Sequence, residues 1–104
     1  MASVILNTTF VIHTSIEQDF LHWVRTVYLP SVKASGTFGE PRVARVMTRI
    51  EPDTESIAIQ MEAADHVAAV KWHDETAALL KDDLCARWNN LAMHFTTYME
   101  ILDL

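Results

Sequence analysis

Two side chains suited to proton transfer, His94 and Tyr98, stand close together near the end of the chain, with Thr96 between them. They fall in a stretch that reads as a β-strand, where alternate residues point to the same face. An imidazole titrates near neutral pH and a phenol can donate a hydrogen bond. The group could move a proton or orient a substrate. It would serve equally well as a hydrogen-bonded interface between subunits, and we favour that interpretation.

A second group of polar residues falls on other predicted strands. Arg45 and Glu62 are predicted to be diagonal neighbours across a hairpin, where Arg45 could clamp a carboxylate through its two parallel N–H donors. The same pair could instead form an ordinary cross-strand ion pair. The complete set of predicted ligand-binding residues is Asn7, Thr9, Arg45, Gln60, Glu62, His94 and Tyr98.

The histidines raise the question of a metal site. The chain has 5 histidines, but no two of them have the i,i+4 spacing with which one helix chelates zinc. His13 and His94 could meet on neighbouring strands, although no third ligand is evident. Glycine-rich phosphate-binding loops are also missing from the sequence. We therefore expect neither a metal nor a cofactor.

Strands are predicted where apolar and polar residues alternate. Residues 4–13 alternate most clearly, and residues 38–50, 55–63 and 91–102 follow the same pattern. A tight turn at Pro52-Asp53 would pair Arg45 with Gln60 on one face of the hairpin. In the last strand the more apolar set, which includes Met93 and Phe95, is expected to face the core.

Two helices are predicted between the strands. The first follows a capping box at Thr14 and Glu17, should kink at Pro30 and should stop at Gly36. The second is capped by Asp65 and ends near Asn89. Its inner stripe is expected to comprise Val67, Val70, Ala77, Leu80 and Leu84.

The predicted order of elements is therefore β-α-β-β-α-β. Right-handed crossovers place both helices on one face of an antiparallel sheet with spatial order 4-1-3-2, which is the α+β ferredoxin-like sandwich. We expect one domain over residues 1–104. The uncovered face mixes apolar residues with hydrogen-bonding ones, and this mixture favours pairing with a second copy around an enclosed, partly polar space.

The placement of aromatic, proline, glycine and arginine residues resembles a small bacterial family known as domain of unknown function 4286. The residues that carry the resemblance are Trp23, Tyr28-Leu29-Pro30, Gly36-Thr37-Phe38, Arg42, Arg45, Arg87-Trp88, Phe95 and Met99-Glu100-Ile101. The resemblance implies the dimeric α/β-barrel group, in which two ferredoxin-like sheets pair through their open faces. That group includes cofactor-free monooxygenases, isomerases, decarboxylases and proteins without a known activity.

Composition excludes some classes of binding partner. The net charge of −6 disfavours nucleic acids and anionic membrane surfaces. The third strand, SIAIQMEA, lacks the stacking aromatics of an RNA-recognition domain. No apolar run is long enough to span a membrane, and the lone Cys85 suits a reducing compartment, so we expect a cytoplasmic protein.

The sequence thus predicts a homodimeric module that binds a small ligand or another protein. The alternative is a cofactor-independent enzyme, resembling a monooxygenase or an isomerase, that acts on a small apolar or aromatic substrate held in the barrel.

Overall fold

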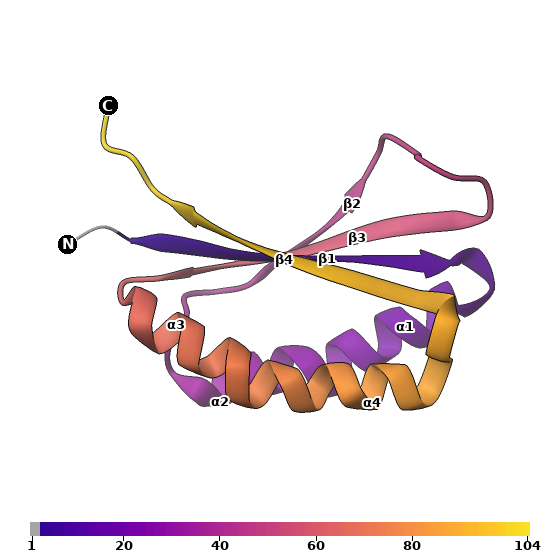
Figure 1. Ribbon diagram of the computed structural model, residues 1–104, viewed down its shortest axis with the longest axis horizontal. Coiled ribbons are helices and arrows are strands. Elements are labelled where there is room, and N and C mark those ends of the chain that lie inside the picture. The colour runs from indigo at the N-terminus through magenta and orange to yellow at the C-terminus, as the bar shows by residue number, and fades with distance from the viewer. Residues whose placement is uncertain (1–2) are drawn as a thin grey trace.

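The computed structural model describes residues 3–104 and shows an antiparallel sheet with helices on one face (Figure 1). The strands are β1 (Val4–His13), β2 (Arg42–Val46), β3 (Thr54–Ala63) and β4 (Ala92–Glu100). They form a 4-stranded sheet in the order β2-β3-β1-β4. The predicted strand order and the ferredoxin-like fold are therefore confirmed.

The first helical rod runs through α1 (Glu17–Trp23), a π-helical segment (Val24–Tyr28) and α2 (Leu29–Ser35). Its start differs from the predicted capping box, because the His13 imidazole accepts the backbone N–H of Ser15 at 3.1 Å. The wider π turn just before Pro30 accommodates a residue that cannot complete the helical hydrogen-bond pattern. The rod ends as predicted at Gly36, whose φ of 67° is left-handed.

The second rod has the same design, with α3 (His66–Trp72), a π-helical segment (His73–Ala77) and α4 (Ala78–Trp88). Asp65 caps it as predicted, accepting the Val67 N–H at 2.9 Å. The predicted inner stripe is correct at Ala77, Leu80 and Leu84 but wrong at Val67, and Val70 is only half-buried. Val67 is 75% exposed, while Ala69 and Trp72 are buried. A π turn holds more residues than an α turn, so it shifts the phase of the apolar stripe.

The core lies between the sheet and the two rods. Alternate residues of β1 are buried beneath the helices, with Leu6, Phe10 and Ile12 fully enclosed. Phe20 and Tyr28 pack onto Phe10, with ring centroids 5.3 and 5.6 Å from it. This layer fixes which face of every strand is turned toward the helices.

The β2–β3 hairpin has a different register from the predicted one. Arg45 pairs with Ile57 rather than Gln60, and Arg42 pairs with Gln60. The connection is a longer loop over residues 47–53 instead of a tight turn at Pro52-Asp53. The register is shifted by an odd number of residues, and such a shift moves every side chain of β2 to the other face. Arg45 therefore lies on the helix side of the sheet, contrary to prediction.

The faces of β4 are also inverted relative to the prediction. His94 pairs with Phe10 and Tyr98 pairs with Leu6, both of which point into the core. His94 and Tyr98 therefore lie on the helix side, whereas Met93 and Phe95 lie on the open face, defined here as the sheet face without helices. Alternation along β4 indicated two distinct faces but did not indicate which of them the helices cover.

Candidate functional site

A row of hydrogen-bonding side chains crosses all the strands on the open face. Arg42 of β2 pairs with Gln60 of β3, Gln60 with Asn7 of β1, and Asn7 with Thr97 of β4. We call Arg42, Gln60, Asn7 and Thr97 the polar row. The Asn7 amide donates to Thr9 at 3.3 Å, while its buried Oδ1 atom accepts no hydrogen bond within residues 3–104. The row thus contains an unmatched acceptor.

Smaller and more apolar residues flank the polar row. The next row along the strands comprises Ala44, Ala58, Thr9 and Phe95. The side chains of Ala44 and Ala58 are single methyl groups, so the sheet surface is recessed there relative to the ring of Phe95. Large apolar side chains surround it, with Met93 68% exposed and Phe95 56% exposed. The open face is therefore a mixed surface, in which exposed apolar side chains lie beside the polar row and Glu62.

The predicted ligand-binding residues divide between the two faces. Asn7, Thr9, Gln60 and Glu62 lie on the open face, since each belongs to the half of its strand that points away from the core. Arg45, His94 and Tyr98 lie on the helix side instead. Only Asn7, Thr9 and Gln60 are close neighbours, with Glu62 one row farther along β3.

Arg42 is the open-face residue that the sequence reasoning missed. It lines a shallow cavity of about 160 Å³ together with Gln60, Glu62, Ile5 and Glu40. Within the part of the chain that the structure describes, no ion pair involves its guanidinium. The correct hairpin register was the only signal that could have selected Arg42 over Arg45.

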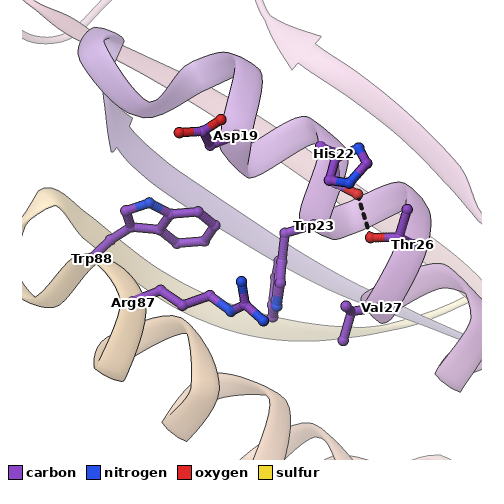
Figure 2. A pocket seen from close by; sticks show the side chains of 7 residues that line it. All are labelled: Asp19, His22, Trp23, Thr26, Val27, Arg87 and Trp88. Atoms are coloured by element: carbon purple, nitrogen blue, oxygen red, sulfur yellow. Dashed lines mark hydrogen bonds between the residues drawn. The ribbon is translucent and has the colours of Figure 1, made fainter.

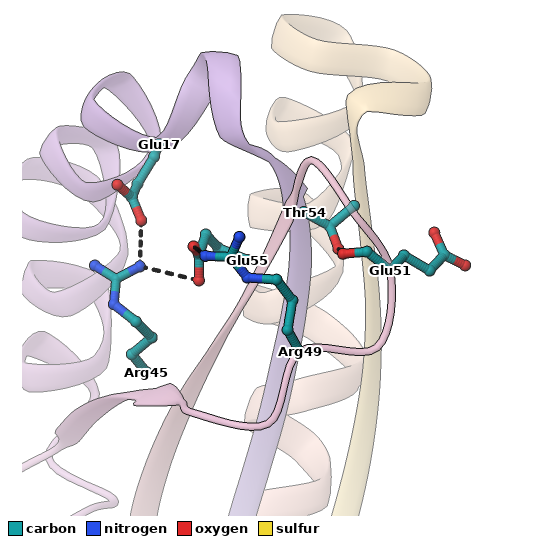
Figure 3. Close-up of polar contacts among 6 residues, drawn as sticks. All are labelled: Glu17, Arg45, Arg49, Glu51, Thr54 and Glu55. Carbon is teal, nitrogen blue, oxygen red and sulfur yellow. Dashed lines mark hydrogen bonds and ion pairs between the residues drawn. The ribbon is translucent and has the colours of Figure 1, made fainter.

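Arg45 is already occupied by carboxylates. Its guanidinium contacts Glu17 of α1 and lies 3.3 Å from Glu55 of β3, which also pairs with Arg49 (Figure 3). The hydrogen bond to Glu17 is the main reason that the pKa of Arg45 is raised. These ion pairs join α1 to the β2–β3 hairpin, so Arg45 has a structural role there and is not a free ligand clamp.

On the helix side, β4 meets the second helical rod in a polar group. We call His73, Lys81, His94, Thr96 and Tyr98 the β4 cluster. The Lys81 ammonium lies 2.7 Å from Nε2 of His73 and donates to the Thr96 hydroxyl at 3.1 Å. The ring of Tyr98 packs edge-on against His73 with centroids 5.9 Å apart. His94 and Tyr98 share one face of β4 as predicted, but that face is turned toward the helices and not toward Asn7 and Thr9.

Burial shifts the titration of this cluster in one consistent direction. Desolvation lowers the pKa of Lys81. It also lowers the pKa of His73 and His94, and the charge of Lys81 lowers both of them further. The pKa of Tyr98 is raised, mainly by desolvation. All four groups therefore favour their neutral forms more than they would in water.

The underside of the cluster reaches the core. The Thr96 hydroxyl lies 3.0 Å from that of Thr8, which is itself buried. Desolvation raises the pKa of Tyr28 to about 12, and its buried hydroxyl has no hydrogen-bond partner within residues 3–104. The phenol therefore stays protonated at neutral pH, and the cluster ends there against apolar packing.

A hollow of about 460 Å³ lies between the two helical rods (Figure 2). Trp23 and Trp88 stand perpendicular in it, with ring centroids 6.0 Å apart. The Trp23 indole donates to Asp83 at 2.8 Å, and Arg87 donates to the same carboxylate oxygen at 3.0 Å. Trp23, Asp83 and Arg87 thus join the two helical rods through one carboxylate, which gives these three residues of the hollow a structural role.

The metal site that His13 and His94 might have formed is not assembled. His13 lies on the open-face half of β1, whereas His94 lies on the helix side. Among residues 3–104, no three histidine, cysteine or acidic side chains gather as a metal site would require. Nor does any helix in those residues have the length and apolarity needed to cross a membrane.

Several solved structures share this fold. HapK from Hahella chejuensis is 13% identical with a TM-score of 0.69, covering 98% of this chain and 94% of its own. A dimeric ferredoxin-like protein from an uncultured marine organism is 12% identical with a TM-score of 0.63, covering 100% and 99%. A Bacillus cereus protein provisionally described as an antibiotic biosynthesis monooxygenase is 12% identical with a TM-score of 0.60, also covering 100% and 99%. Such low identities establish the fold alone.

Sequence comparison identifies the family. No curated protein matches the chain significantly. A family described as "Domain of unknown function (DUF4286)" matches residues 3–102, which is nearly the whole chain. The fold and the sequence together thus confirm the resemblance, and the chain belongs to the DUF4286 family.

Proposed function

We propose that this protein is a homodimeric ligand-binding module whose two subunits pair through their open faces. The observation that carries the proposal is the exposure of Met93 and Phe95 on the face without helices. Burying apolar surface contributes about 25 cal/mol per Å². A second copy of the chain would cover both side chains without any change of fold. We regard residues 1–104 as the single domain of each subunit.

The structural neighbours support this arrangement at the level of the fold. One of them is described as dimeric and covers the whole of this chain. Symmetric pairing of two identical faces is also the commonest way in which soluble proteins form dimers. The polar row would then face the partner's open face, where apolar contacts surround it.

The proposed ligand is a small carboxylate with an apolar or aromatic body. Arg42 would bind the carboxylate through paired N–H donors. The amides of Gln60 and Asn7 would supply further hydrogen bonds, and the apolar body would lie over Ala44 and Ala58. A second subunit would have to close the space, because the cavity of about 160 Å³ in one subunit is smaller than usual ligand pockets.

The enzyme alternative uses the same space. The space between the open faces lacks the proton-transfer residues that this alternative expected, because His94 and Tyr98 lie on the other face of the sheet. A cofactor-independent reaction in the barrel would have to rely on Asn7, Gln60 and Arg42, which bind and orient better than they transfer protons. We therefore favour binding over catalysis, in a cytoplasmic protein whose charge of −6 disfavours nucleic acids.

Light scattering coupled to size-exclusion chromatography tests the dimer. Wild-type protein should have twice the chain mass of 11.8 kDa. Phe95→Asp should reduce it to the monomer mass, because the interface would bury an unpaired charge. The matched control is Val67→Asp, which alters an even more exposed apolar residue on the helix layer and should leave the dimer intact. A monomeric wild type at micromolar concentration would refute the proposal.

Salicylate, a fluorescent aromatic carboxylate, tests the ligand class. Arg42→Gln should weaken its binding at least tenfold, equivalent to about 1.4 kcal/mol. Arg45→Gln removes the same charge from the other face and should leave the affinity unchanged. Equal losses in the two variants would contradict the assignment of Arg42. Wild-type affinity weaker than about 10 mM would contradict the ligand class itself.

A further inference from the structure

Lys81 differs from an ordinary surface lysine in the partners of its ammonium group. Its Nζ atom lies 2.7 Å from Nε2 of His73 and 3.1 Å from the Thr96 hydroxyl. Both partners are uncharged when the imidazole is neutral. Within residues 3–104, no carboxylate pairs with Lys81. The amine is therefore half-buried without a negative charge to stabilise its protonated form.

His73 is oriented to act as a base toward this amine. The Lys81 ammonium can only donate, so Nε2 accepts from it and the neutral imidazole carries its own proton on Nδ1, which lies 3.5 Å from the Asp74 carboxylate. Buried amines with lowered proton affinity are the usual nucleophiles toward carbonyl groups. Desolvation lowers the pKa of Lys81 in this way. The short contact to His73 and the desolvation of Lys81 thus both favour an uncharged, nucleophilic amine.

Lys81 is only partly buried, so part of its side chain remains in contact with solvent. β4 is an edge strand of the sheet, and His94, which belongs to the same cluster, is exposed. His73 itself begins the π-helical segment of the second rod, and such segments occur frequently at functional sites. The cluster therefore opens to solvent along the edge where β4 meets α4.

We propose that Lys81 is a reactive amine that forms an imine with small aldehydes or ketones, with His73 as the base that frees it. Lys81 passes a proton to Nε2 of His73, and its nitrogen lone pair forms a bond to the carbonyl carbon. The carbonyl oxygen takes up one proton from the nitrogen and the one that His73 returns, and it leaves as water while the C=N bond forms. Of the three ammonium protons, two leave in that water and one remains on the iminium nitrogen. No oxidant or reductant is needed.

This site is independent of the proposed dimer, because the β4 cluster lies on the opposite side of the sheet from the polar row. The other lysines provide internal standards. Lys33 is exposed and pairs with Glu40 at 3.6 Å, and Lys71 is exposed on α3. Neither has a histidine partner among the hydrogen bonds of the described chain.

Reductive trapping on the full chain tests the inference. Folded protein is treated briefly with propanal and cyanoborohydride at neutral pH, and the alkylated fraction of each lysine is measured by peptide mass spectrometry. Lys81 should react at least fivefold faster than Lys33 or Lys71. Equal or slower reaction at Lys81 would overturn the proposal, whether the cause were an ordinary amine or a blocked one. Reaction in denaturant, where the three rates should converge, shows that the preference comes from the fold.

His73→Gln separates the base from a mere hydrogen-bond partner. Glutamine can still accept a hydrogen bond but cannot take up a proton, so trapping at Lys81 should slow at least threefold while Lys33 and Lys71 keep their rates. An unchanged Lys81 rate would overturn the role of His73. The pH profile of wild type covers the case in which this variant does not fold. Trapping at Lys81 should persist to lower pH than trapping at Lys33. The titratable groups around Lys81 are His73, Asp74, His94 and Tyr98. Coincident pH profiles for the two lysines would refute the proposal.

Discussion

The two faces of β4 differ in a way that reverses the usual expectation. Its outward face carries Met93 and Phe95, which are 68% and 56% exposed. Its inward face, beneath the helices, carries His94, Thr96 and Tyr98, of which Thr96 is hydrogen-bonded to Lys81. A strand whose apolar face points away from its own core is suited to being covered from outside. The two faces carry the two proposals. The outer face would form the dimer, and the inner face would hold the reactive amine of Lys81.

The largest expected difference between the two faces is in folding stability. Phe10 is fully buried, so Phe10→Ala should lower the free energy of unfolding by about 3–5 kcal/mol. Phe95→Ala should have a smaller effect that shrinks on dilution, since contacts between subunits depend on concentration. Urea denaturation at several protein concentrations measures both. A concentration-independent loss at Phe95 as large as that at Phe10 would mean that this ring belongs to the core of one subunit.

A smaller effect is expected from pH, and it concerns the inner face alone. The lowered pKa of His73 and of His94 means that the folded state binds protons less readily than the unfolded chain, whose histidines titrate near pH 6.5. Their contribution to stability is therefore present above about pH 6.5 and is lost as the pH falls toward the folded pKa values. The groups facing them are Lys81 of α4, Asp74 and Tyr98.

Thermal unfolding at a series of pH values checks this expectation. The wild-type Tm should fall between pH 7 and pH 5, and the fall should be shallower in a variant with both His73→Gln and His94→Gln. His22→Gln, which alters an exposed histidine of α1, should reproduce the wild-type slope. If the double variant and wild type had the same slope, the inner face would not be the pH-sensitive one.

Much of the fold could be predicted because local chemistry determines it. The Asp65 cap and the Gly36 stop, for example, depend only on the residues beside them. The hairpin register could not be read in the same way. Apolar residues face one another in both registers, and the ion pairs of Arg45 with Glu17 and Glu55 connect segments far apart in the sequence. The π segments were missed as well, because a single extra residue in a helical turn leaves no clear periodic signal.

The structure therefore brings together only some of the predicted ligand-binding residues. Asn7, Thr9 and Gln60 lie together because β1 and β3 alternate unambiguously. His94 and Tyr98 lie on the other face, since the rule that the more apolar side faces the core fails for this edge strand, whose inward face meets Lys81 and His73. Lys81 was missed altogether. Its distinction lies in the absence of a carboxylate partner and the presence of His73, neither of which is visible before the helix is folded against β4.

Solvent exposure of the methionine methyl groups tests the central claim most directly. In methyl-labelled wild type, a dissolved paramagnetic gadolinium chelate relaxes methyl groups according to their exposure. Met47, 93% exposed in the hairpin loop, and Met61, buried at 2%, set the two limits. A dimer paired through the open faces predicts that Met93 is protected like Met61 in wild type and relaxes like Met47 in Phe95→Asp. Strong relaxation of Met93 in wild type at micromolar concentration would contradict the account.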